Sequence, residues 1–266
     1  MRLDAFAKLT LSLRVTGRRA DGYHDLDALV VSVNEPHDEL LLRAADDVSI
    51  TMTGPHAAAV PADDTNLAVR AAREAGANVA IELHKGIPPG AGLGGGSADA
   101  AAVLLGVDAP DPFLIAESLG ADVPFCLSGG AMRMRGIGDV LEPIELPELW
   151  IVIATPRYGC ATADVYRAYD EMTAFKRRVV EIPGLPRLTN ELEAAAHQLE
   201  PRLVDFRNAI QEAAEVPALM AGSGSSYFVV FLGQADAEAA RARVVDAVDG
   251  QVVVGHTVAA GVRIQK

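Results

Sequence analysis

The stretch IPPGAGLGGGSADAA, residues 87–101, carries five glycines among the seven residues 90–96 and then passes directly into an alanine-rich run. Glycine adopts positive φ and lets other atoms approach the backbone closely, so such a loop can present main-chain N–H groups to bound oxygens. The run after Ser97 predicts a helix, whose N-terminus would add a partial positive charge. We interpret the stretch as a phosphate-binding loop, and the alternative is a flexible loop followed by a capped helix.

Two common phosphate-binding motifs do not account for this stretch. A P-loop requires glycine, lysine and then serine or threonine, and no Lys-Ser or Lys-Thr pair follows these glycines. Gly90, Gly92 and Gly95 satisfy G-x-G-x-x-G, but a dinucleotide fingerprint needs a strand that leads directly into the first glycine, and Pro88 with its neighbouring proline intervenes. We therefore expect main-chain N–H groups to hold phosphates, with Ser97 as the helix N-cap or as a hydroxyl beside a phosphate-bound metal ion.

The overall composition is typical of a globular protein with a hydrophobic core. Of the 266 residues, 50% are apolar and 22% are charged, and the net charge is −13. No apolar run reaches the roughly 18 residues of a membrane span, and no basic stripe suggests nucleic-acid binding. The N-terminus lacks the pattern of a signal peptide, and Cys126 and Cys160 have no metal or C-x-x-C spacing. We expect a cytoplasmic protein that binds neither nucleic acid nor membrane.

The hydrophobic pattern predicts an α+β protein with two domains. Alternation over residues 8–15 and several apolar runs after it predict strands in the first third of the chain. A helix over about 65–75 and a strand over 79–84 lead to the glycine-rich stretch. We place the boundary between domains 1–146 and 147–266, which should share a broad interface. In the second half we expect helices over 163–169, between 190 and 214, and over 235–248, and strands over 149–156, 227–232, 251–256 and 258–262.

Three stretches, in order along the chain, resemble the GHMP kinase superfamily, named for its galactose, homoserine, mevalonate and phosphomevalonate members. PPGAGLGGGSADAA (88–101) is similar to its central motif, AKLTLSLRVTGRRADGYHDL (7–26) to its N-terminal motif in one branch, and MAGSGSSYFVVF (220–231) to its C-terminal motif. TGRRADGYHDLDAL (16–29), LGADVPF (119–125) and NELE (190–193) further resemble the 4-diphosphocytidyl-2-C-methyl-D-erythritol kinase family.

The resemblance implies a fold and an activity. An N-terminal domain of the ribosomal-protein-S5-like type would pack against a C-terminal α+β domain, and ATP and the acceptor would meet in the cleft between them. The chain would use ATP and Mg²⁺ to phosphorylate the 2-hydroxyl of 4-diphosphocytidyl-2-C-methyl-D-erythritol in non-mevalonate isoprenoid precursor biosynthesis. Its partner would be this small molecule, and the chain would be a monomer or a weak homodimer. The metal ligands are left open.

The resemblance also assigns roles to individual residues. Lys8 and Asp122 match the catalytic pair: Asp122 would accept the proton of the attacking hydroxyl, and Lys8 would keep that carboxylate ionised and stabilise charge on the transferring oxygens. The positions that would bind ATP are Asn66, Leu67, Lys85, Pro88, Gly90, Ala91, Gly92, Leu93, Gly94, Gly95, Gly96 and Ser97. The positions that would bind the acceptor are Thr10, Tyr23, His24, Thr162, Tyr166, Gly222, Ser223 and Gly224. Among them, Tyr23 and Tyr166 would stack on the two faces of the cytosine ring.

Several of these residues have a purely structural alternative. Asp122 could cap a short helix that has Pro124 in its first turn, Lys8 could be solvated on the polar face of a strand, and Asp99 could stabilise a helix dipole or help to bind Mg²⁺. The chain also departs from the family at Thr10, where asparagine is usual, and at Val30, where an aromatic residue is expected.

Three other functions are considered. The chain could be a GHMP kinase for a different alcohol of the homoserine or mevalonate class, because the two departures leave the acceptor open. It could be a nucleotide-binding sensor without turnover, although the presence of both Lys8 and Asp122 argues against this. It could be a dinucleotide-dependent oxidoreductase, which the prolines before Gly90 argue against.

Overall fold

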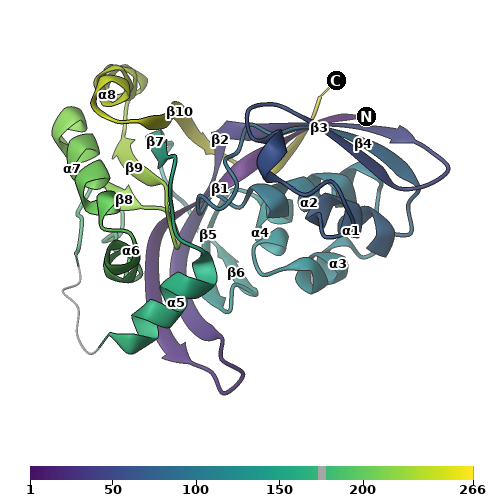
Figure 1. Cartoon of the computed structure of the whole chain (residues 1–266), viewed down its shortest axis with the longest axis horizontal. Helices are drawn as coiled ribbons and strands as arrows, with labels where there is room; N and C mark the ends of the chain where they lie inside the picture. Colours follow the sequence, from purple (N-terminus) through teal and green to yellow (C-terminus); the bar gives the residue numbers. More distant parts are fainter. Residues whose placement is uncertain (173–177, 266) are drawn as a thin grey trace.

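The computed structural model describes residues 1–172 and 178–265, and these residues form an α+β fold with two lobes (Figure 1). The strands are β1 Arg2–Arg18, β2 His24–Ala44, β3 Ser49–Thr53, β4 Val79–His84, β5 Ala131–Gly136, β6 Val140–Pro143, β7 Trp150–Pro156, β8 Leu219–Met220, β9 Tyr227–Phe231, β10 Gly250–Val258 and β11 Val262–Gln265. The α-helices are α1 Leu67–Glu74, α2 Gly95–Gly106, α3 Pro112–Leu119, α4 Val123–Ser128, α5 Thr162–Glu171, α6 Glu193–Leu199, α7 Arg202–Ala214 and α8 Gln234–Ala247.

The two lobes are joined by one continuous run of paired strands. The first lobe contains β1–β6 with α1–α4, the second contains β7–β9 with α5–α8, and β1 and β2 extend between them in Figure 1. The strand order is β11-β1-β2-β10-β7-β9-β8. Strand β10 pairs with β2 as well as with β7, and β11 pairs with β1. Strand β10 therefore bridges the lobes and β11 adds to the edge of β1, so both pair with strands on the other side of the boundary predicted near residue 146.

Most of the elements expected from the hydrophobic pattern are present. The helix expected over 65–75 is α1, the strand over 79–84 is β4, and the helix expected over 235–248 is α8. The strand expected over 258–262 is wrong, because β10 ends at Val258 and β11 begins at Val262. Between them Gly261 lies against the end of α4, so closely that a Cβ on it would overlap the carbonyl oxygen of Cys126. None of the described helices is long and apolar enough to cross a membrane.

Helix α2, which follows the glycine-rich stretch, lies in the interior of the first lobe. It packs against α1, α3 and α4 and against β1 and β2. A helix with so many neighbours needs small side chains on most of its surface, and its residues Ala98, Ala100, Ala101 and Ala102 have no exposed area. The alanine-rich run therefore lets α2 pack closely against the sheet, and this packing fixes the position of its N-terminus.

This packing predicts that Ala101→Leu destabilises the fold. Ala101 has no exposed area on a helix packed on several sides, so the added atoms have no space and we expect a loss of about 1–3 kcal/mol in the free energy of unfolding. Ala239→Leu, at an exposed position of α8, is the matched control, and its free energy of unfolding should stay within about 0.5 kcal/mol of that of the wild type. Urea denaturation measures both, and equal stability of the two variants would contradict the prediction.

Candidate active site

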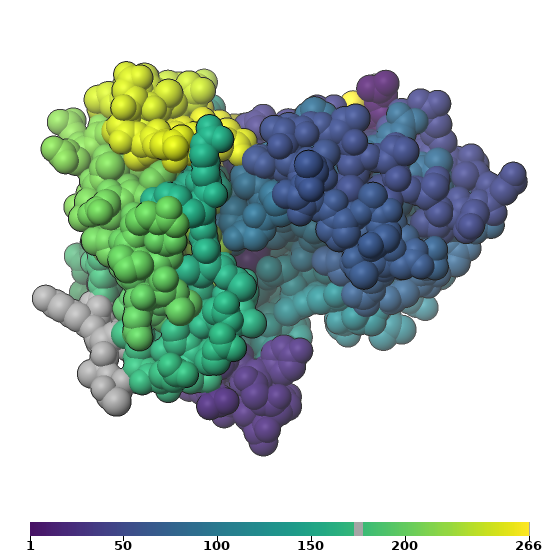
Figure 2. Space-filling view, in the orientation of Figure 1, coloured from purple at the N-terminus to yellow at the C-terminus, as the bar shows by residue number. Residues whose placement is uncertain are grey.

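A cleft of about 1130 Å³ lies between the two lobes. Figure 2 shows the surface hollowed where the lobes meet, beside α5. The first lobe lines the cleft with β1, the beginning of β2, the glycine-rich loop and the residue before α4, and the second lobe lines it with α5 and the loop before β9. Lys8 and Asp122 line this cleft, together with eighteen of the twenty residues predicted for the ATP and acceptor sites. The two exceptions are Asn66 and Gly224. The structure therefore brings stretches that are far apart in sequence into one site.

The glycine-rich loop crosses the cleft with its backbone in left-handed conformations. Gly90, Gly92 and Gly94 have φ values of 67°, 78° and 68°, which residues other than glycine rarely adopt. At Gly92 a Cβ would overlap the carbonyl oxygen of Ala221, in the glycine-rich loop of the second lobe. The amide of Ser226, in the same loop, donates to the carbonyl of Ala91 at 3.1 Å. The two glycine-rich loops are therefore in direct backbone contact.

Helix α2 begins earlier than the sequence indicated. Gly94 is its N-cap in the left-handed conformation, so the prediction that Ser97 is the N-cap is wrong. Glycine takes this place because of its positive φ and because Lys8 lies alongside: a Cβ on Gly94 would be 3.2 Å from the Cβ of Lys8. Ser97 lies in the first turn of α2, half-buried, and lines the cleft. The loop and the N-terminus of α2 thus form one surface of N–H groups, which suits an anion.

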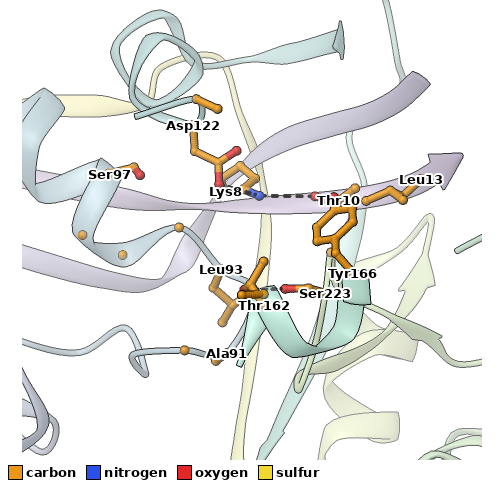
Figure 3. A pocket seen from close by; sticks show the side chains of 18 of the residues that line it. Lys8, Thr10, Leu13, Ala91, Leu93, Ser97, Asp122, Thr162, Tyr166 and Ser223 are labelled. Atoms are coloured by element: carbon orange, nitrogen blue, oxygen red, sulfur yellow. Dashed lines mark hydrogen bonds and ion pairs between the residues drawn. The ribbon is translucent and has the colours of Figure 1, made fainter. Parts of the chain in front are cut away.

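Lys8 and Asp122 form an ion pair beside this loop (Figure 3). The Lys8 ammonium is 3.0 Å from Oδ2 of Asp122, and the Lys8 amide donates to the carbonyl of Leu93 at 3.0 Å. The Lys8 side chain is 9% exposed, so its interpretation as a solvated surface lysine is wrong. Asp122 precedes α4, but its side chain makes no capping hydrogen bond. With 34% of its side chain exposed, Asp122 remains accessible to a ligand in the cleft.

A buried charge cluster holds the two ends of the glycine-rich loop. The Lys85 ammonium contacts the carboxylates of Asp38 and Asp99, the latter at 2.7 Å, and all three side chains are at most 2% exposed. Before the loop, Oδ1 of Asp38 accepts hydrogen bonds from the amides of Gly86 and Ile87 at 2.7 and 2.9 Å. After it, Asp99 belongs to α2. The loop is therefore fixed at both ends to one ammonium group.

The electrostatics of this cluster follow from its burial. Burial and the nearby Asp38 charge raise the pKa of Asp99 well above its ordinary value. Burial by itself would lower the pKa of Lys85, but the Asp99 and Asp38 carboxylates outweigh it and raise that pKa. Asp99 lies beyond the first turn of α2, does not line the cleft and is paired with Lys85, so both of its predicted roles, at the helix dipole and at Mg²⁺, are wrong.

Lys85 and Asn66, both predicted at the ATP site, have side chains that are already engaged. The Lys85 ammonium is held by the two carboxylates, although the residue still borders the cleft. Asn66 caps α1: its Oδ1 accepts from the amide of Ala68 at 2.9 Å, and its Nδ2 donates to the carbonyl of Pro61 at 2.8 Å. Asn66 is 5% exposed and does not line the cleft, so its side chain serves the start of α1 in this structure.

The predicted acceptor residues lie where α5 faces β1 and β2. Tyr166 stacks on His24, with the ring centroids 4.9 Å apart and an interplanar angle of 25°. Burial and the negative charge of Asp122 raise the pKa of Tyr166 to about 12. Tyr23 is 63% exposed at the end of the β1–β2 hairpin. One face of Tyr166 is thus covered by an imidazole, while Tyr23 has no aromatic neighbour among the described residues.

The second lobe orients its glycine-rich loop through two side chains. Thr162, the first residue of α5, and Ser223 share a hydrogen bond of 2.9 Å between their hydroxyl groups, marked in Figure 3. Asn190 is buried behind the loop, and its Nδ2 donates to the carbonyls of Met220 and Gly222 at 2.8 and 2.7 Å. Sequence reasoning noted Asn190 only as part of NELE, and its role in holding the loop was missed.

Four charged residues that line the cleft were also missed as site residues: Arg18, Asp21, Arg167 and Asp170. Helical spacing could have indicated Asp170, because it lies four residues after Tyr166 on α5 and therefore on the same side of the helix. Arg18 and Asp21 lie in TGRRADGYHDLDAL, the stretch that already indicated Tyr23 and His24, and Arg167 has no comparable local signal.

The charged groups of the cleft do not form a metal cage. Among the described residues no group of three or more histidine, cysteine, aspartate or glutamate side chains is placed to hold a metal ion. The cleft does offer the Asp122 carboxylate and the Ser97 hydroxyl. Such a site suits a cation that takes most of its oxygen ligands from a bound phosphate compound and from water.

Comparisons with known proteins agree on the family. The family profile described as GHMP kinases N terminal domain matches residues 66–130. A 4-diphosphocytidyl-2-C-methyl-D-erythritol kinase from Paracoccus denitrificans is 42% identical over 248 residues, which cover 90% of this chain and 89% of the relative. The enzyme of the same name from Rhodospirillum rubrum is 38% identical, covering 88% and 84%.

Solved structures give the same result. A crystal structure of 4-(cytidine 5'-diphospho)-2C-methyl-D-erythritol kinase matches with a TM-score of 0.80 and 34% identity, over 97% of this chain and 99% of that one. A homoserine kinase from Cytophaga hutchinsonii matches with a TM-score of 0.69 and 21% identity, over 99% and 96% of the two chains. The second likeness shows a shared fold.

The buried cluster predicts a large effect of Lys85→Met. Removing the ammonium leaves the carboxylates of Asp38 and Asp99 buried without their common partner, which should cost about 3–5 kcal/mol of folding free energy. The matched control is Arg43→Met, which removes an exposed ion pair with Glu82 and should cost less than about 1 kcal/mol. Urea denaturation compares the free energies of unfolding of the two variants. If Lys85→Met lowered this free energy by less than about 1 kcal/mol, as expected for a surface ion pair, the role of the cluster would be contradicted.

Proposed function

Because the chain belongs to the 4-diphosphocytidyl-2-C-methyl-D-erythritol kinase family, we propose that it transfers the γ-phosphoryl group of ATP to the 2-hydroxyl of 4-diphosphocytidyl-2-C-methyl-D-erythritol. It is an ATP-dependent small-molecule kinase of the GHMP type, and its reaction belongs to isoprenoid precursor biosynthesis. The observation that carries the proposed mechanism is the Lys8–Asp122 ion pair beside the glycine-rich loop, inside a cleft that both lobes line.

In the proposed mechanism Asp122 is the base. Its carboxylate is partly exposed in the cleft and can accept the proton of the acceptor hydroxyl as that oxygen attacks the γ-phosphorus. Lys8 balances the charge of this carboxylate at 3.0 Å and is placed to stabilise negative charge on the transferring oxygens. The hydrogen bond from the Lys8 amide to Leu93 fixes this pair relative to the loop.

In the same proposal ATP is held chiefly by the loop backbone. The N–H groups of residues 90–97 and the N-terminus of α2 would contact the phosphates, and Leu67 would lie at the adenine. The residues present fit Mg²⁺ held mainly by the phosphates, with Ser97 as its protein oxygen. When bound, Mg²⁺ would neutralise part of the negative charge of the phosphates.

The acceptor would occupy the part of the cleft between α5 and the hairpin of β1 and β2. Thr10, Tyr23, His24 and Tyr166 would surround its cytidyl part. Thr162 and the loop residues Gly222–Gly224 would contact its phosphates. The stacking of Tyr166 on His24 supports a ring-binding function for this region, because it already presents aromatic surface to the cleft.

Three further features belong to the proposal. The domains extend over 1–146 and 147–266, the protein acts in the cytoplasm, and it acts as a monomer or a weak homodimer. Cys126 and Cys160 are free, which fits a reducing compartment. The catalytic pair and both glycine-rich loops come from one chain, so the proposed reaction needs no second copy.

Replacing the proposed base should separate chemistry from binding. In Asp122→Asn we expect kcat to fall by about 10²–10⁴-fold, because the amide cannot accept the proton. The dissociation constant of ATP, measured by calorimetry, should change by less than about threefold, since the loop backbone is untouched. Glu117→Gln, an exposed carboxylate of α3 that does not line the cleft, is the control. Full kcat in Asp122→Asn would remove this residue from the mechanism.

A substrate panel tests the acceptor. In a coupled assay of ADP release, we expect turnover of 4-diphosphocytidyl-2-C-methyl-D-erythritol and none above background of homoserine or mevalonate, since neither carries a ring to contact Tyr166 and His24. Turnover of either alcohol without turnover of the cytidyl compound would show that the acceptor assignment is wrong. ATP binding without phosphoryl transfer to any of them would favour a sensor.

A further inference from the structure

One side of α5 forms the wall of the cleft in the second lobe. Thr162, Tyr166 and Asp170 follow one another at intervals of four residues, so they lie along the same side of the helix, and all three line the cleft. Thr162 contacts Ser223 of the glycine-rich loop, and Tyr166 stacks on His24. The proposed function gives roles to these two residues and none to Asp170.

Asp170 joins α5 to the end of the β1–β2 hairpin. Its Oδ1 accepts a hydrogen bond of 2.7 Å from Nε2 of His24, the first residue of β2. Its Oδ2 lies 3.4 Å from Nε of Arg18, the last residue of β1. One carboxylate of the second lobe therefore holds the ends of both strands of a hairpin that starts in the first lobe and packs its far end, through Leu13 and Leu26, against the second.

The His24 ring is fixed from several directions by this helix. Tyr166 covers one face, Tyr169 approaches edge-on with centroids 6.4 Å apart at 85°, and Asp170 holds Nε2. The His24 side chain is only 7% exposed, and the residue borders the cleft. Its position thus depends on α5, although His24 is part of the other lobe.

The hydrogen bond also selects one form of the imidazole. A carboxylate only accepts hydrogen bonds, so Nε2 of His24 must carry the hydrogen. In a neutral imidazole this leaves Nδ1 as an acceptor. Arg18 balances the carboxylate charge on the opposite oxygen. Without Asp170, Nε2 of His24 would lose its acceptor and with it the preference for this tautomer, while the ring contacts with Tyr166 and Tyr169 would remain.

We propose that Asp170 is a positioning residue for the acceptor: by holding His24 and the end of the β1–β2 hairpin against α5, it sets the affinity for the acceptor and leaves that for ATP unchanged. This inference rests on the proposed function, which places the acceptor beside His24 and Tyr166. The ion-pair and hydrogen-bond partners of Asp170 among the described residues are Arg18 and His24, and neither belongs to the phosphate loop.

Steady-state kinetics on the full chain test this role. In Asp170→Ala we expect KM for 4-diphosphocytidyl-2-C-methyl-D-erythritol to rise about tenfold to a hundredfold, as for loss of a hydrogen bond to a charged group. KM for ATP and kcat at saturating acceptor should stay within about twofold. Asp170→Asn should raise this KM less, because its amide oxygen can still accept a hydrogen bond from Nε2 of His24. This variant replaces Asp170→Ala in the test if the alanine variant does not fold. Glu171→Ala and Glu171→Gln, which alter the adjacent exposed carboxylate, are matched controls.

A spectroscopic measurement tests the contact without any substrate. In ¹⁵N NMR of the imidazole groups at about pH 8, where ordinary histidine is neutral, the His24 signal should show the form with hydrogen on Nε2. Asp170→Ala should shift this signal toward a mixture of tautomers, and Glu171→Ala should not. His24→Gln identifies the signal by its loss.

The outcomes separate this inference from the proposed function. A wild-type protein that does not phosphorylate the cytidyl compound overturns the proposed function and the acceptor role with it. If the wild type is active, equal changes of both KM values in Asp170→Ala, or no change in either, overturn the role of Asp170 alone. An unchanged His24 signal in Asp170→Ala also overturns it.

Discussion

The contact between Gly92 and Ala221 is the constraint on which the rest of the site depends. The two backbones are so close that no side chain fits at Gly92, and the amide of Ser226 adds a hydrogen bond to Ala91 next to it. Each glycine-rich loop thereby limits the positions that the other can take. The cleft exists because two loops from different lobes meet at this point and then diverge, one toward α2 and the other toward β9.

Each loop is held from behind by buried polar groups. Lys85 with its two carboxylates fixes both ends of the first loop, and Asn190 fixes the second through two carbonyl groups. A glycine-rich segment would otherwise lose much conformational entropy on binding a ligand. Because this ordering already occurs on folding, the N–H groups are oriented before ATP arrives, which is the requirement for electrostatic stabilisation of a transferring phosphoryl group. The buried charges thus serve the site by ordering the loop backbone.

Local sequence patterns predicted the helices and most strands, since apolar periodicity reports which face of an element is buried. They did not predict the partners of charged residues. Asp38, Lys85 and Asp99 meet although they belong to β2, the end of β4 and α2, and no local period links such positions. The pairing of Lys8 with Asp122 came from the family resemblance. The N-cap was placed at Ser97, and the need for glycine at the actual N-cap is seen only in the folded chain, where Gly94 has a positive φ and lies against the Lys8 side chain.

The two departures from the family pattern have different consequences. Val30 is 1% exposed within the main hydrophobic core and does not line the cleft, so the missing aromatic ring at this position concerns packing. Thr10 does line the cleft, and its hydroxyl lies 3.5 Å from the Lys8 ammonium. A Cβ on Gly222 would be 3.7 Å from the same hydroxyl, so Thr10 already reaches the second loop. Asparagine would extend further into the space that the acceptor is proposed to occupy. Threonine therefore leaves more space in this part of the cleft and contacts Lys8, and under the proposed function we expect recognition of the acceptor ring to depend more on His24 and Tyr166.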